Sequence, residues 1–500
     1  MALLHLIEQI LVVGLAGKAP QQMDVLVEAD KFVAIAPRID VSSVHVDERT
    51  DGRGKMMMAG LVNAHHHSHD RFDKGRFAGL PLEIWMGLYN PPTHARRWSP
   101  RDVYLRTLIN AIEMLKGGIT TIVDDIHFGA AIDPESVYAA FQAYSDLGVR
   151  AEVSVAWSDR PFHEGIPYLS DVLAQGSTPS PTAGWSSNSV LDFWRELARS
   201  WGGRVRFVLS PSGPQRCTTE FLQRTWDIAA QFDLPVLIHV LETRIQALTA
   251  QKMYGGSMVA YLNEHGLLNR HSVLAHGVWL TLPEMDLLAR SQASVIHNPA
   301  CNLKLGSGIA PIGELLKRGV NVGLGTDNNN GNDLNSMFDA LRMSALLSGI
   351  GRADADASLS ADQAFELATS NGARALGRDA LTGTIEVGKQ ADFVVLDLNS
   401  ASFLPLNEPM TQLVFCEQGQ SVLQVYVGGR RLIDRGRVAR IDEAALRAEL
   451  AERLPAISAA IAAAEHAAAE LRPSLLAAYR RCVEDPLMQP WLSRINAIQR

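Results

Sequence analysis

Cysteine is scarce in this sequence, and no two cysteines lie close together. The 500 residues include four, at positions 217, 301, 416 and 482. Without a Cys-x-x-Cys pair or another short spacing, a disulfide framework is disfavoured, and buried thiols in a reducing compartment are expected. The sequence therefore predicts a cytoplasmic protein.

A basic stripe and a long apolar run are also missing. The formal net charge is -8, and lysine and arginine are dispersed along the chain. This argues against nucleic acid or an anionic membrane as a partner. No apolar stretch approaches the length that spans a bilayer. Residues 2–16 are interrupted by His5 and Glu8 and follow no basic segment, so they predict a first β-strand instead of a signal peptide. A small molecule is the expected partner.

The composition is that of an ordinary globular protein, with 47% hydrophobic and 20% charged residues. A chain of this length exceeds one simple core, so a large domain with a smaller companion is expected. Short strands at 10–13, 24–27 and 32–35 predict a small antiparallel sheet that ends near Asp51-Gly52-Arg53-Gly54.

Beyond this block, apolar strands alternate with helical patterns, which is typical of βαβ units and a parallel sheet. One helix is clearly delimited, since Ser99 is a good N-cap, Pro100 suits the first helical position, and Gly117-Gly118 ends the apolar stripe. With the strand that carries His65, eight strands are expected, which favours a (β/α)₈ TIM barrel. The rival, a doubly wound open sheet, is ranked lower because no Gly-rich loop opens the first unit. The other seven strands are predicted at 119–125, 149–156, 205–210, 235–239, 272–276, 293–297 and 320–327.

Strand patterns return near the C-terminus, at 383–385, 391–397 and 422–427. Their likeness to the opening strands predicts that both ends of the chain build one small composite β-sandwich domain. From Asp442 the tail is Ala-rich, which predicts helix, and Pro455 and Pro473 are expected to break it. Packing or subunit contact is the expected role of this tail. The predicted segments are 1–58 and 381–440 for the two parts of the β domain, 59–380 for the barrel, and 441–500 for the helical extension.

Two insertions interrupt the barrel pattern, at 69–98 and 157–189. The first is rich in aromatic residues, and the second contains a Gly-, Ser- and Pro-rich stretch at 176–181 that predicts a mobile loop. Long loops on the catalytic face of a barrel often act as lids, and plain surface decoration is the alternative.

Four histidines occur within five positions, at 65, 66, 67 and 69. In a strand, His65 and His67 share one face while His66 turns to the other. Two imidazoles fixed in this way form a chelating pair for a divalent metal. The alternative is a His-rich loop that binds no metal.

Four later strand ends also carry histidine or a carboxylate: His239 with Glu242 close behind, His276, His297 and Asp327. Each alone is more often a structural residue than a ligand. A barrel, however, brings its strand C-termini to one rim. There His65, His67, His239 and Asp327 would supply three imidazoles and a carboxylate and leave a position for water.

The chain resembles the amidohydrolase superfamily, in the branch of cytosine, guanine and triazine deaminase-like enzymes. The resemblance implies that His65, His67, His239 and Asp327 bind one metal and that Asp327 also takes a proton from water. It further implies that Glu242 shuttles a proton to the ring nitrogen and leaving group, while His276 orients the water or steadies developing charge. The matching stretches are 59–67 (AGLVNAHHH), 115–121 (LKGGITT), 239–242 (HVLE), 275–277 (AHG), 297–302 (HNPACN), 325–327 (GTD) and 383–392 (GTIEVGKQAD).

Two departures from the family pattern are visible. Where binuclear relatives keep a bridging lysine, the strand at 204–210 has none, so a single metal is favoured. Ala59 replaces the usual proline before Gly60, with little functional effect expected. His69, Trp85, His276 and Asn302 are the candidate substrate contacts, with ordinary core burial as the alternative for Trp85.

The resulting hypothesis is a metal-dependent aminohydrolase that deaminates an amino-substituted N-heterocycle of purine, pterin, pyrimidine or s-triazine type and releases ammonia. The nearest alternative is a hydrolase of the same fold that expels chloride, an alkylamine or a thiol, or cleaves an amide or carbamate. A more remote alternative is a non-catalytic scaffold protein. Zn²⁺ is the expected metal, and Fe²⁺, Co²⁺ or Mn²⁺ suit the same donors. A homodimer or higher even-numbered homo-oligomer is expected from the resemblance and from the prevalence of symmetric assemblies.

Overall fold

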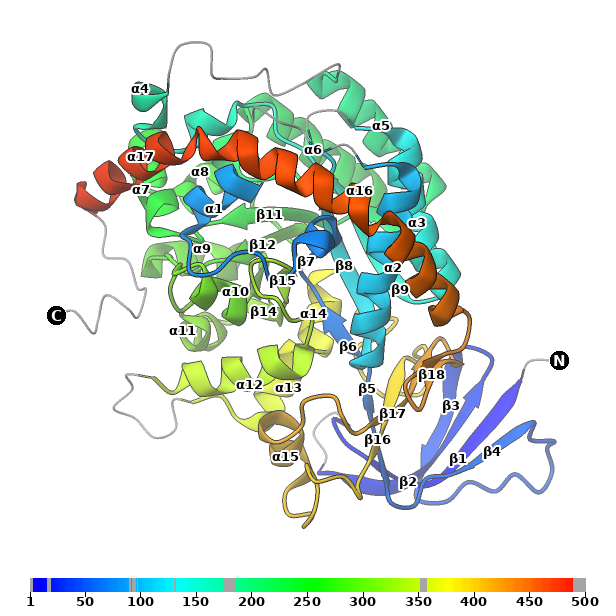
Figure 1. Cartoon of the computed structure of the whole chain (residues 1–500). Coiled ribbons are helices and arrows are strands. Elements are labelled where there is room, and N and C mark those ends of the chain that lie inside the picture. The colour runs from blue at the N-terminus through cyan, green and yellow to red at the C-terminus, as the bar shows by residue number, and fades with distance from the viewer. Residues whose placement is uncertain are drawn as a thin grey trace.

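A mixed, mainly antiparallel sheet and a helix-covered set of parallel strands divide the chain between them (Figure 1). The computed structural model describes residues 3–15, 19–89, 91, 96, 98–129, 132–173, 185–350 and 358–488. The loop predicted at 176–181 lies outside the described residues.

Both ends of the chain contribute to the first sheet, as expected. β1 (Leu4–Val12), β2 (Gln21–Glu28) and β3 (Lys31–Ala36) pair antiparallel, and β5 (Lys55–Ala59) joins them to β16 (Phe393–Asp397), with Ala59 opposite Phe393. The remaining members are β4 (Glu48–Asp51), β17 (Val422–Val427), β18 (Arg430–Asp434) and β19 (Arg437–Val438).

Two expectations about this region are wrong. The described strands form one continuous sheet, not the two sheets of a sandwich, because β5 pairs with β1 on one edge and with β16 on the other. Residues 383–385 form no strand. Gly383 has a positive φ of 92° and packs against the backbone near Ser370, so the chain turns there.

The parallel strands form two four-stranded sheets. The first contains β6 (Leu61–Asn63), β8 (Ile119–His127), β9 (Arg150–Ala156) and β10 (Val205–Val208). The second contains β11 (Val236–Val240), β12 (Ser272–His276), β13 (Ser294–His297) and β14 (Asn321–Leu324). Hydrogen bonds join the edges, from the Leu237 amide to the Leu209 carbonyl (2.8 Å) and from the Ala64 amide to the Leu324 carbonyl (2.9 Å).

The strand expected to carry His65 and His67 is broken. After β6 the chain bends at His65, and β7 (His66–His67) pairs with β15 (Asp327–Asn328). The last predicted strand is split in the same way at Gly325. A side chain there would meet the Asn298 amide oxygen and the His65 carbonyl oxygen, at 2.4 and 2.6 Å from its Cβ, so only glycine allows this close crossing.

Helices surround the parallel strands. The predicted helix at Ser99 is confirmed as α2 (Pro100–Lys116), with a capping box between Ser99 and Asp102 and Gly117 at its end. The other helices around the strands are α3 (Pro134–Leu147), α4 (Leu169–Val172), α5 (Ser187–Ser200), α6 (Thr219–Phe232), α7 (Arg244–Met253), α8 (Met258–Glu264), α9 (Leu282–Ser291), α10 (Pro299–Lys304), α11 (Ile312–Lys317), α12 (Met337–Ser348), α13 (Ala361–Leu367), α14 (Ser370–Ala375) and α15 (Pro409–Phe415).

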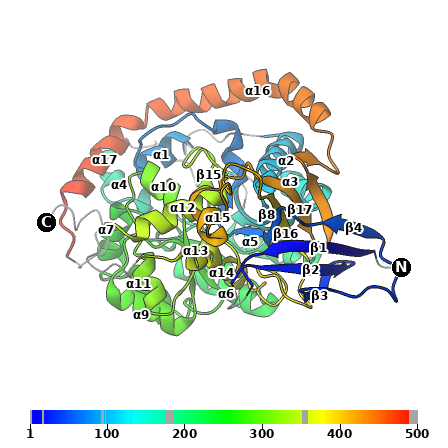
Figure 2. The ribbon, with the colours of Figure 1, turned by 90° about the horizontal axis from the view of Figure 1, so that it is seen from below.

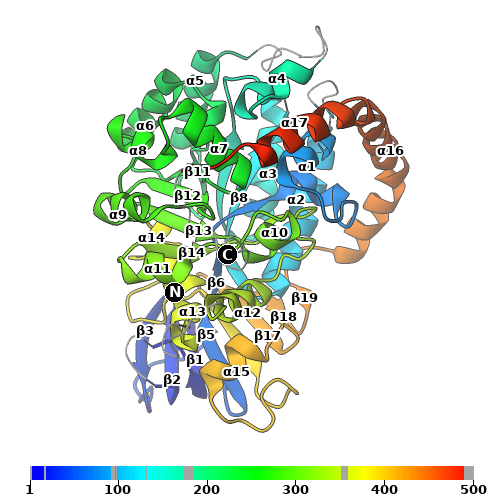
Figure 3. The same ribbon diagram turned by 90° about the vertical axis from the view of Figure 1, so that its left-hand side faces the viewer.

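The C-terminal extension crosses the face of the molecule that carries the first insertion (Figures 1 and 3). α16 (Glu443–Ala469) runs unbroken through Pro455, so the predicted break there is wrong; the Pro455 ring lies on the solvent side of the helix. Pro473 does mark a break, because it stands in the first turn of α17 (Arg472–Glu484), where proline costs no intrahelical hydrogen bond. In the view from below, both helices arch along the far edge of the molecule (Figure 2).

α17 packs against α1 (Leu82–Tyr89), the helix of the first insertion. A Cβ on Gly87 would lie 2.5 Å from a methyl carbon of Leu475, so the two helices approach closely. Ile84, Leu471, Leu475 and Ala478 belong to one buried apolar cluster with Ile245 of α7. We call α1 and α17 together the roof. Among the described helices, none is long and apolar enough to cross a bilayer.

Candidate active site

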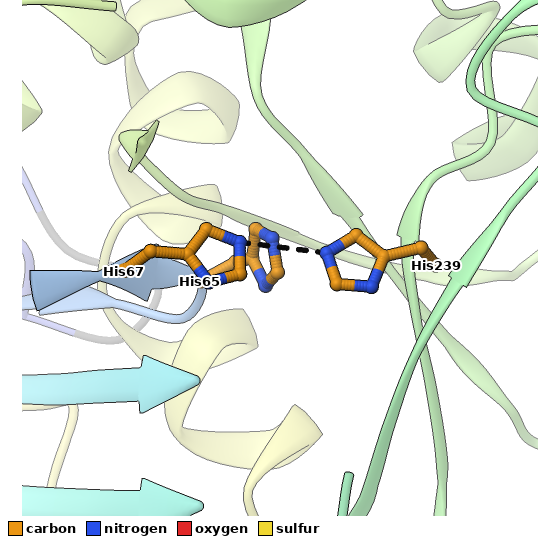
Figure 4. A group of neighbouring side chains, drawn as sticks. All are labelled: His65, His67 and His239. Carbon is orange, nitrogen blue, oxygen red and sulfur yellow. Dashed lines mark hydrogen bonds between the residues drawn. The ribbon is translucent and has the colours of Figure 1, made fainter. Parts of the chain in front are cut away.

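Side chains from several strand ends meet beneath the roof. The imidazoles of His65, His67 and His239 lie with ligand atoms within 4.8 Å of one another (Figure 4). The ligand atoms of His65, His276 and Asp327 lie within the same distance of one another. The Asp327 Oδ1 atom is 3.5 Å from His65 Nε2 and 3.2 Å from His67 Nε2. The four residues predicted as ligands are therefore brought together.

Backbone carbonyls set the orientation of two of these imidazoles. The Nδ1 atom of His67 donates to the Asp125 carbonyl at 2.5 Å, and that of His239 donates to the Ser212 carbonyl at 2.8 Å. Since a carbonyl can only accept, each ring turns its Nε2 toward the other, 3.4 Å away. This is the outer-shell pattern that holds histidine ligands to a metal.

His66 points away from this group, as the alternation of the strand predicts. Its Nδ1 donates to the Asp327 carbonyl at 2.9 Å, and its Nε2 accepts from the side-chain amide of Asn110. Burial lowers the pKa of His66 to about 3, so the ring is neutral. His66 thus supports the backbone of Asp327 and is no ligand.

Three residues of the site have a left-handed backbone, with φ of 53° at Leu241, 77° at His276 and 61° at Asp327. Side chains other than glycine rarely adopt this region, and such residues cluster at functional sites. Leu241 follows β11, His276 is the last residue of β12, and Asp327 begins β15 after the break that follows β14. The conformation directs His276, Asp327 and Glu242, the residue after Leu241, to the same rim.

Asp327 and His67 stabilise each other's charge. Burial opposes ionisation of Asp327, but the nearby imidazoles of His65 and His67 outweigh it and hold the pKa of this carboxyl well below its usual range. Burial likewise opposes protonation of His67, yet the hydrogen bond and attraction to Asp327, with Asp125 nearby, raise its pKa to about 10. A positive charge between these residues is therefore stabilised, whether a proton or a metal cation carries it.

Glu242 and His276 lie beside Asp327. His276 Nε2 is 3.5 Å from Glu242 Oε2 and 3.6 Å from Asp327 Oδ2. Burial, with repulsion from Asp327 and Glu83, raises the pKa of Glu242 well above its usual value and so favours its protonated form. Burial lowers the pKa of His276 to about 4. The pKa values of the two carboxyl groups are thus shifted in opposite directions, beside a neutral imidazole.

A pocket opens above this group, with the roof as part of its wall. Trp85 and Tyr89 of α1 stack with ring centroids 5.3 Å apart and an interplanar angle of 12°, which makes a flat aromatic surface. Besides site residues already named, the lining includes His69, Leu82, Glu83, Met86, Asp125, His127, Phe162, Ile166, Ser212, Gln215, Arg216, Ile245 and Gln246.

The candidate substrate contacts have different positions. His69 and Trp85 line the pocket, and so does His276. Asn302 is fully buried and lies behind His276, where its Oδ1 atom accepts from His276 Nδ1 at 2.9 Å. Asn302 is not among the residues that line this pocket, and its geometry is that of a support for His276. His297 is buried beneath the site, outside the pocket lining.

Several lining residues were missed by sequence reasoning. Gln215 and Arg216 lie in a short 3₁₀ helix, η3 (Pro214–Arg216), a few residues after β10, so the rule that strand ends meet at one rim could have indicated them. Glu83 lies in the first insertion, and no sequence pattern determines how that insertion is placed relative to the parallel strands.

The donor set fits a divalent metal. His65 Nε2 is buried and makes no hydrogen bond, although it faces Asp327 and the other imidazoles. A buried polar atom without a partner is costly, and a cation held by nitrogen and oxygen donors would satisfy it. His65, His67, His239 and Asp327 can therefore hold one metal ion.

Comparisons with known proteins agree with this geometry. The model of the amidohydrolase family matches residues 56–432. A 5'-deoxyadenosine deaminase of Methanothermobacter thermautotrophicus is 33% identical over 440 residues, or 87% of this chain and 96% of that protein. A 5-methylthioadenosine/S-adenosylhomocysteine deaminase of Thermococcus onnurineus is 32% identical over 413 residues, 82% of this chain and 89% of its own length.

Solved structures of proteins with deaminase or hydrolase names are also similar to this chain. The zinc-bound adenosine deaminase of Xanthomonas campestris has a TM-score of 0.81 and 29% identity, covering 91% of this chain and 98% of that one. Atrazine chlorohydrolase from Arthrobacter aurescens has a TM-score of 0.80 over 91% of this chain and 100% of its own. Its identity is 24%, so that likeness concerns the fold.

Proposed function

Because the chain belongs to the amidohydrolase family, and is a hydrolase that acts on carbon–nitrogen bonds, we propose that it deaminates adenosine-type nucleosides. Water replaces the exocyclic amine of the adenine ring, and the products are the ring carbonyl compound and ammonia. The approach of Glu242, His276 and Asp327 within 3.6 Å, beneath an aromatic pocket, carries this proposal. The names of the most similar relatives support the choice of a purine nucleoside.

We assign His65, His67, His239 and Asp327 as the ligands of a single divalent metal, with Zn²⁺ as the first choice. The same donors accept Fe²⁺, Co²⁺ and Mn²⁺. When bound, the metal supplies Lewis acidity that makes water a nucleophile near neutral pH.

The protein side chains divide the proton transfers between them. Asp327, ionised and near the ligand nitrogens, accepts a proton from the attacking water. Glu242, whose pKa is raised well above its usual value by burial, donates its carboxyl proton to the ring nitrogen. It then takes up the hydroxyl proton of the adduct and passes it to the departing amine, and the proton held by Asp327 restores the Glu242 carboxyl. His276 is neutral, and because Nδ1 donates to Asn302, its Nε2 lone pair faces the reacting groups and orients the water. Asn302 is then a positioning residue.

The aromatic wall suits a flat heterocycle. Trp85 and Tyr89 offer a stacked surface, with Leu82 and Ile245 beside them. Such surfaces bind planar rings through dispersion and apolar burial. His69 and Trp85 are therefore proposed as substrate contacts.

We also propose that the two parallel sheets close into one (β/α)₈ barrel. The hydrogen bonds at Leu209 and Ala64 support this, and so does a shared buried cluster with Val62, Val123, Leu237, Val273 and Ile296. The segments 1–58 and 381–440, 59–380 and 441–500 are the proposed domains. We further propose that the protein is cytoplasmic and forms an even-numbered homo-oligomer. A native mass measurement would test the number of subunits.

The test is ammonia release from a panel of adenosine, 5'-deoxyadenosine, 5'-methylthioadenosine, S-adenosylhomocysteine, guanine, cytosine, a pterin and melamine. Enzyme of measured metal content is compared with chelator-treated enzyme and with enzyme restored by each candidate metal. Turnover of the adenosine-type members alone, lost on chelation and restored by one metal, is expected.

A different outcome would be equally informative. Metal-loaded enzyme that releases no ammonia from any member would contradict the proposal and direct attention to chloride, thiol or alkylamine products. Turnover confined to guanine or a triazine would retain the chemistry and reject the adenosine-type substrate.

A further inference from the structure

The catalytic pocket is lined from both parallel sheets. Glu242, His276 and Asp327 lie at or next to β11, β12 and β15, which belong to or adjoin the second sheet. On the side of the first sheet, Asp125 and His127 of β8 and Ala156 of β9 line the pocket, together with Arg216 in the segment after β10. A ring whose amine faces Glu242 can extend its other substituents toward Arg216.

Among the described residues, no carboxylate oxygen lies within 4.0 Å of the Arg216 guanidinium. The pocket carboxylates interact elsewhere: Glu83 accepts from Thr243, the Oδ1 atom of Asp125 from Ser154 and Glu242 from Ser307, while Asp327 faces the histidines. The Oδ2 atom of Asp125 makes no hydrogen bond, but it too lies more than 4.0 Å from the guanidinium. A partly buried cation without a partner is unfavourable, and it indicates that an anion binds there.

The two other arginines near the pocket differ in this respect. Arg96 is paired with Asp73 at 2.6 Å, and both side chains are buried. Arg106 lies in the field of the Asp70, Asp73 and Asp124 carboxylates. Arg216 alone of these three is left for a charge from outside the protein.

The side chain of Arg216 is held in place. Its Nη1 atom donates to Ser212 Oγ at 3.1 Å, and its guanidinium lies 5.6 Å from the ring centroid of Phe162. Beside it, Gln215 is 6% exposed, lines the pocket, and has an Oε1 atom without a hydrogen-bond partner. A fixed guanidinium is suited to bind an oxyanion. The Oε1 atom of Gln215 can only accept a hydrogen bond, so it suits a donor on the ligand, such as a hydroxyl or an ammonium group.

We propose that Arg216 forms a subsite for an oxyanion, a carboxylate or phosphate, carried by the substrate on the side remote from the amine. This rests on the proposed deamination of adenosine-type nucleosides and narrows the substrate to members with an anionic substituent. Arg216 acts on binding and leaves the chemical step to Glu242, His276 and Asp327.

Matched substrate pairs test this: adenosine with adenosine 5'-monophosphate, and 5'-methylthioadenosine with S-adenosylhomocysteine. The wild-type enzyme is expected to favour an anionic member by about tenfold or more in kcat/KM, as a charged hydrogen bond warrants. Arg216→Met should abolish that preference, and the loss should appear as a higher KM for the anionic members. Arg216→Lys should keep part of it. Arg224→Gln, on the exposed face of α6, is the matched control and should change nothing.

The outcomes separate the two proposals. If the wild type deaminates neither member of a pair, the proposed function fails. If it deaminates both members of each pair equally, or if Arg216→Met keeps the preference, the function stands and the subsite is refuted. Should Arg216→Met not fold, the wild-type ratio and Arg216→Lys still decide. Inorganic phosphate that stimulates turnover of the neutral members would assign Arg216 to a free anion and overturn its assignment to the substrate.

Discussion

The pocket joins two regions that were built in different ways, its floor and its roof. The floor, formed by His65, His67, His239, Glu242, His276 and Asp327, comes from the ends of parallel strands whose backbone positions are tied by ladder hydrogen bonds. The roof is an insertion helix, α1, held from behind by α17, nearly 400 residues later in the chain. In the proposed mechanism, the floor residues carry out the chemical step and the roof forms part of the pocket wall. Substitutions in the floor should therefore lower kcat, whereas substitutions in the roof should raise KM.

The largest effect is expected at the floor, from Asp327→Asn. An amide can neither accept the proton from water nor balance the charge beside His65 and His67, so kcat/KM should fall by about 10⁴-fold or more. Bound metal, measured by elemental analysis, should fall with it. Asp286→Asn, which removes a surface partner of Arg318, is the control. An active, metal-loaded Asp327→Asn variant would refute the assignment.

Glu242→Gln should come next, with kcat lowered by about 10²- to 10³-fold while KM and metal content change little. The amide fills the same space and keeps a contact with Ser307, but it cannot give up a proton. Steady-state kinetics on the best substrate of the panel measure the effect. Glu264→Gln on the exposed face of α8 should be neutral. Intact turnover in Glu242→Gln would exclude the proton-transfer role.

Leu475→Ala tests the roof. Leu475 is 5% exposed and contacts α1 at Gly87, so its truncation should lower the free energy of unfolding by about 2–4 kcal/mol. It should also loosen α1 and raise KM severalfold while kcat and metal content stay near wild type. Urea unfolding and kinetics at saturating substrate measure both.

The control for this roof variant is Leu454→Ala, a residue of α16 that is 50% exposed. A loss of kcat and metal in Leu475→Ala, with KM unchanged, would show that roof and floor are not separable in the way described here.

The smallest effect should come from Glu83, which joins roof to floor through the hydroxyl of Thr243 at the start of α7. Burial raises the pKa of Glu83 to about 7 from a usual value of 4.5. Because the folded state holds this proton more tightly than the unfolded state, wild-type stability falls as pH rises from 4.5 to about 7 and is constant above.

Glu83→Gln should remove this fall in stability with rising pH, because glutamine does not titrate. Its free energy of unfolding relative to wild type should increase over that pH range by at most about 3 kcal/mol and then level off. Urea unfolding at several pH values measures the difference, with Glu264→Gln as a pH-independent control. A difference that shrinks as pH rises would contradict the raised pKa.

The sequence predicted much of the floor because its information is local. An apolar strand followed by histidine or aspartate defines each position, and the rule that strand ends share a rim brings them together. It predicted less about geometry: His65 and His67 lie on two short segments, and only the crossing at Gly325 brings Asp327 close to both. Asn302 was expected to touch substrate, yet its carbonyl oxygen is directed at His276.

The sequence did not predict that α1 and α17 pack together beside the pocket. α1 shows aromatic residues typical of either a core or a pocket wall, and the Ala-rich tail shows no sequence link to it. Pro455 was expected to end a helix that in fact continues, because an exposed proline can be accommodated by a helix whose inner face is packed. Glu83, Gln215 and Arg216 became visible as pocket residues only when long-range packing was known.

By itself, then, the sequence determined the reaction class, the group of candidate metal donors and the parallel-strand scaffold, since these depend on residue chemistry and on short-range periodicity. The tertiary structure alone decided which residues line the pocket and how charge is distributed around it. The physical reason is the range of the interactions. Strand patterning acts between neighbours in sequence, whereas the contact of Leu475 with Gly87, and the distance of Arg216 from every carboxylate that the structure describes, are properties of the folded chain.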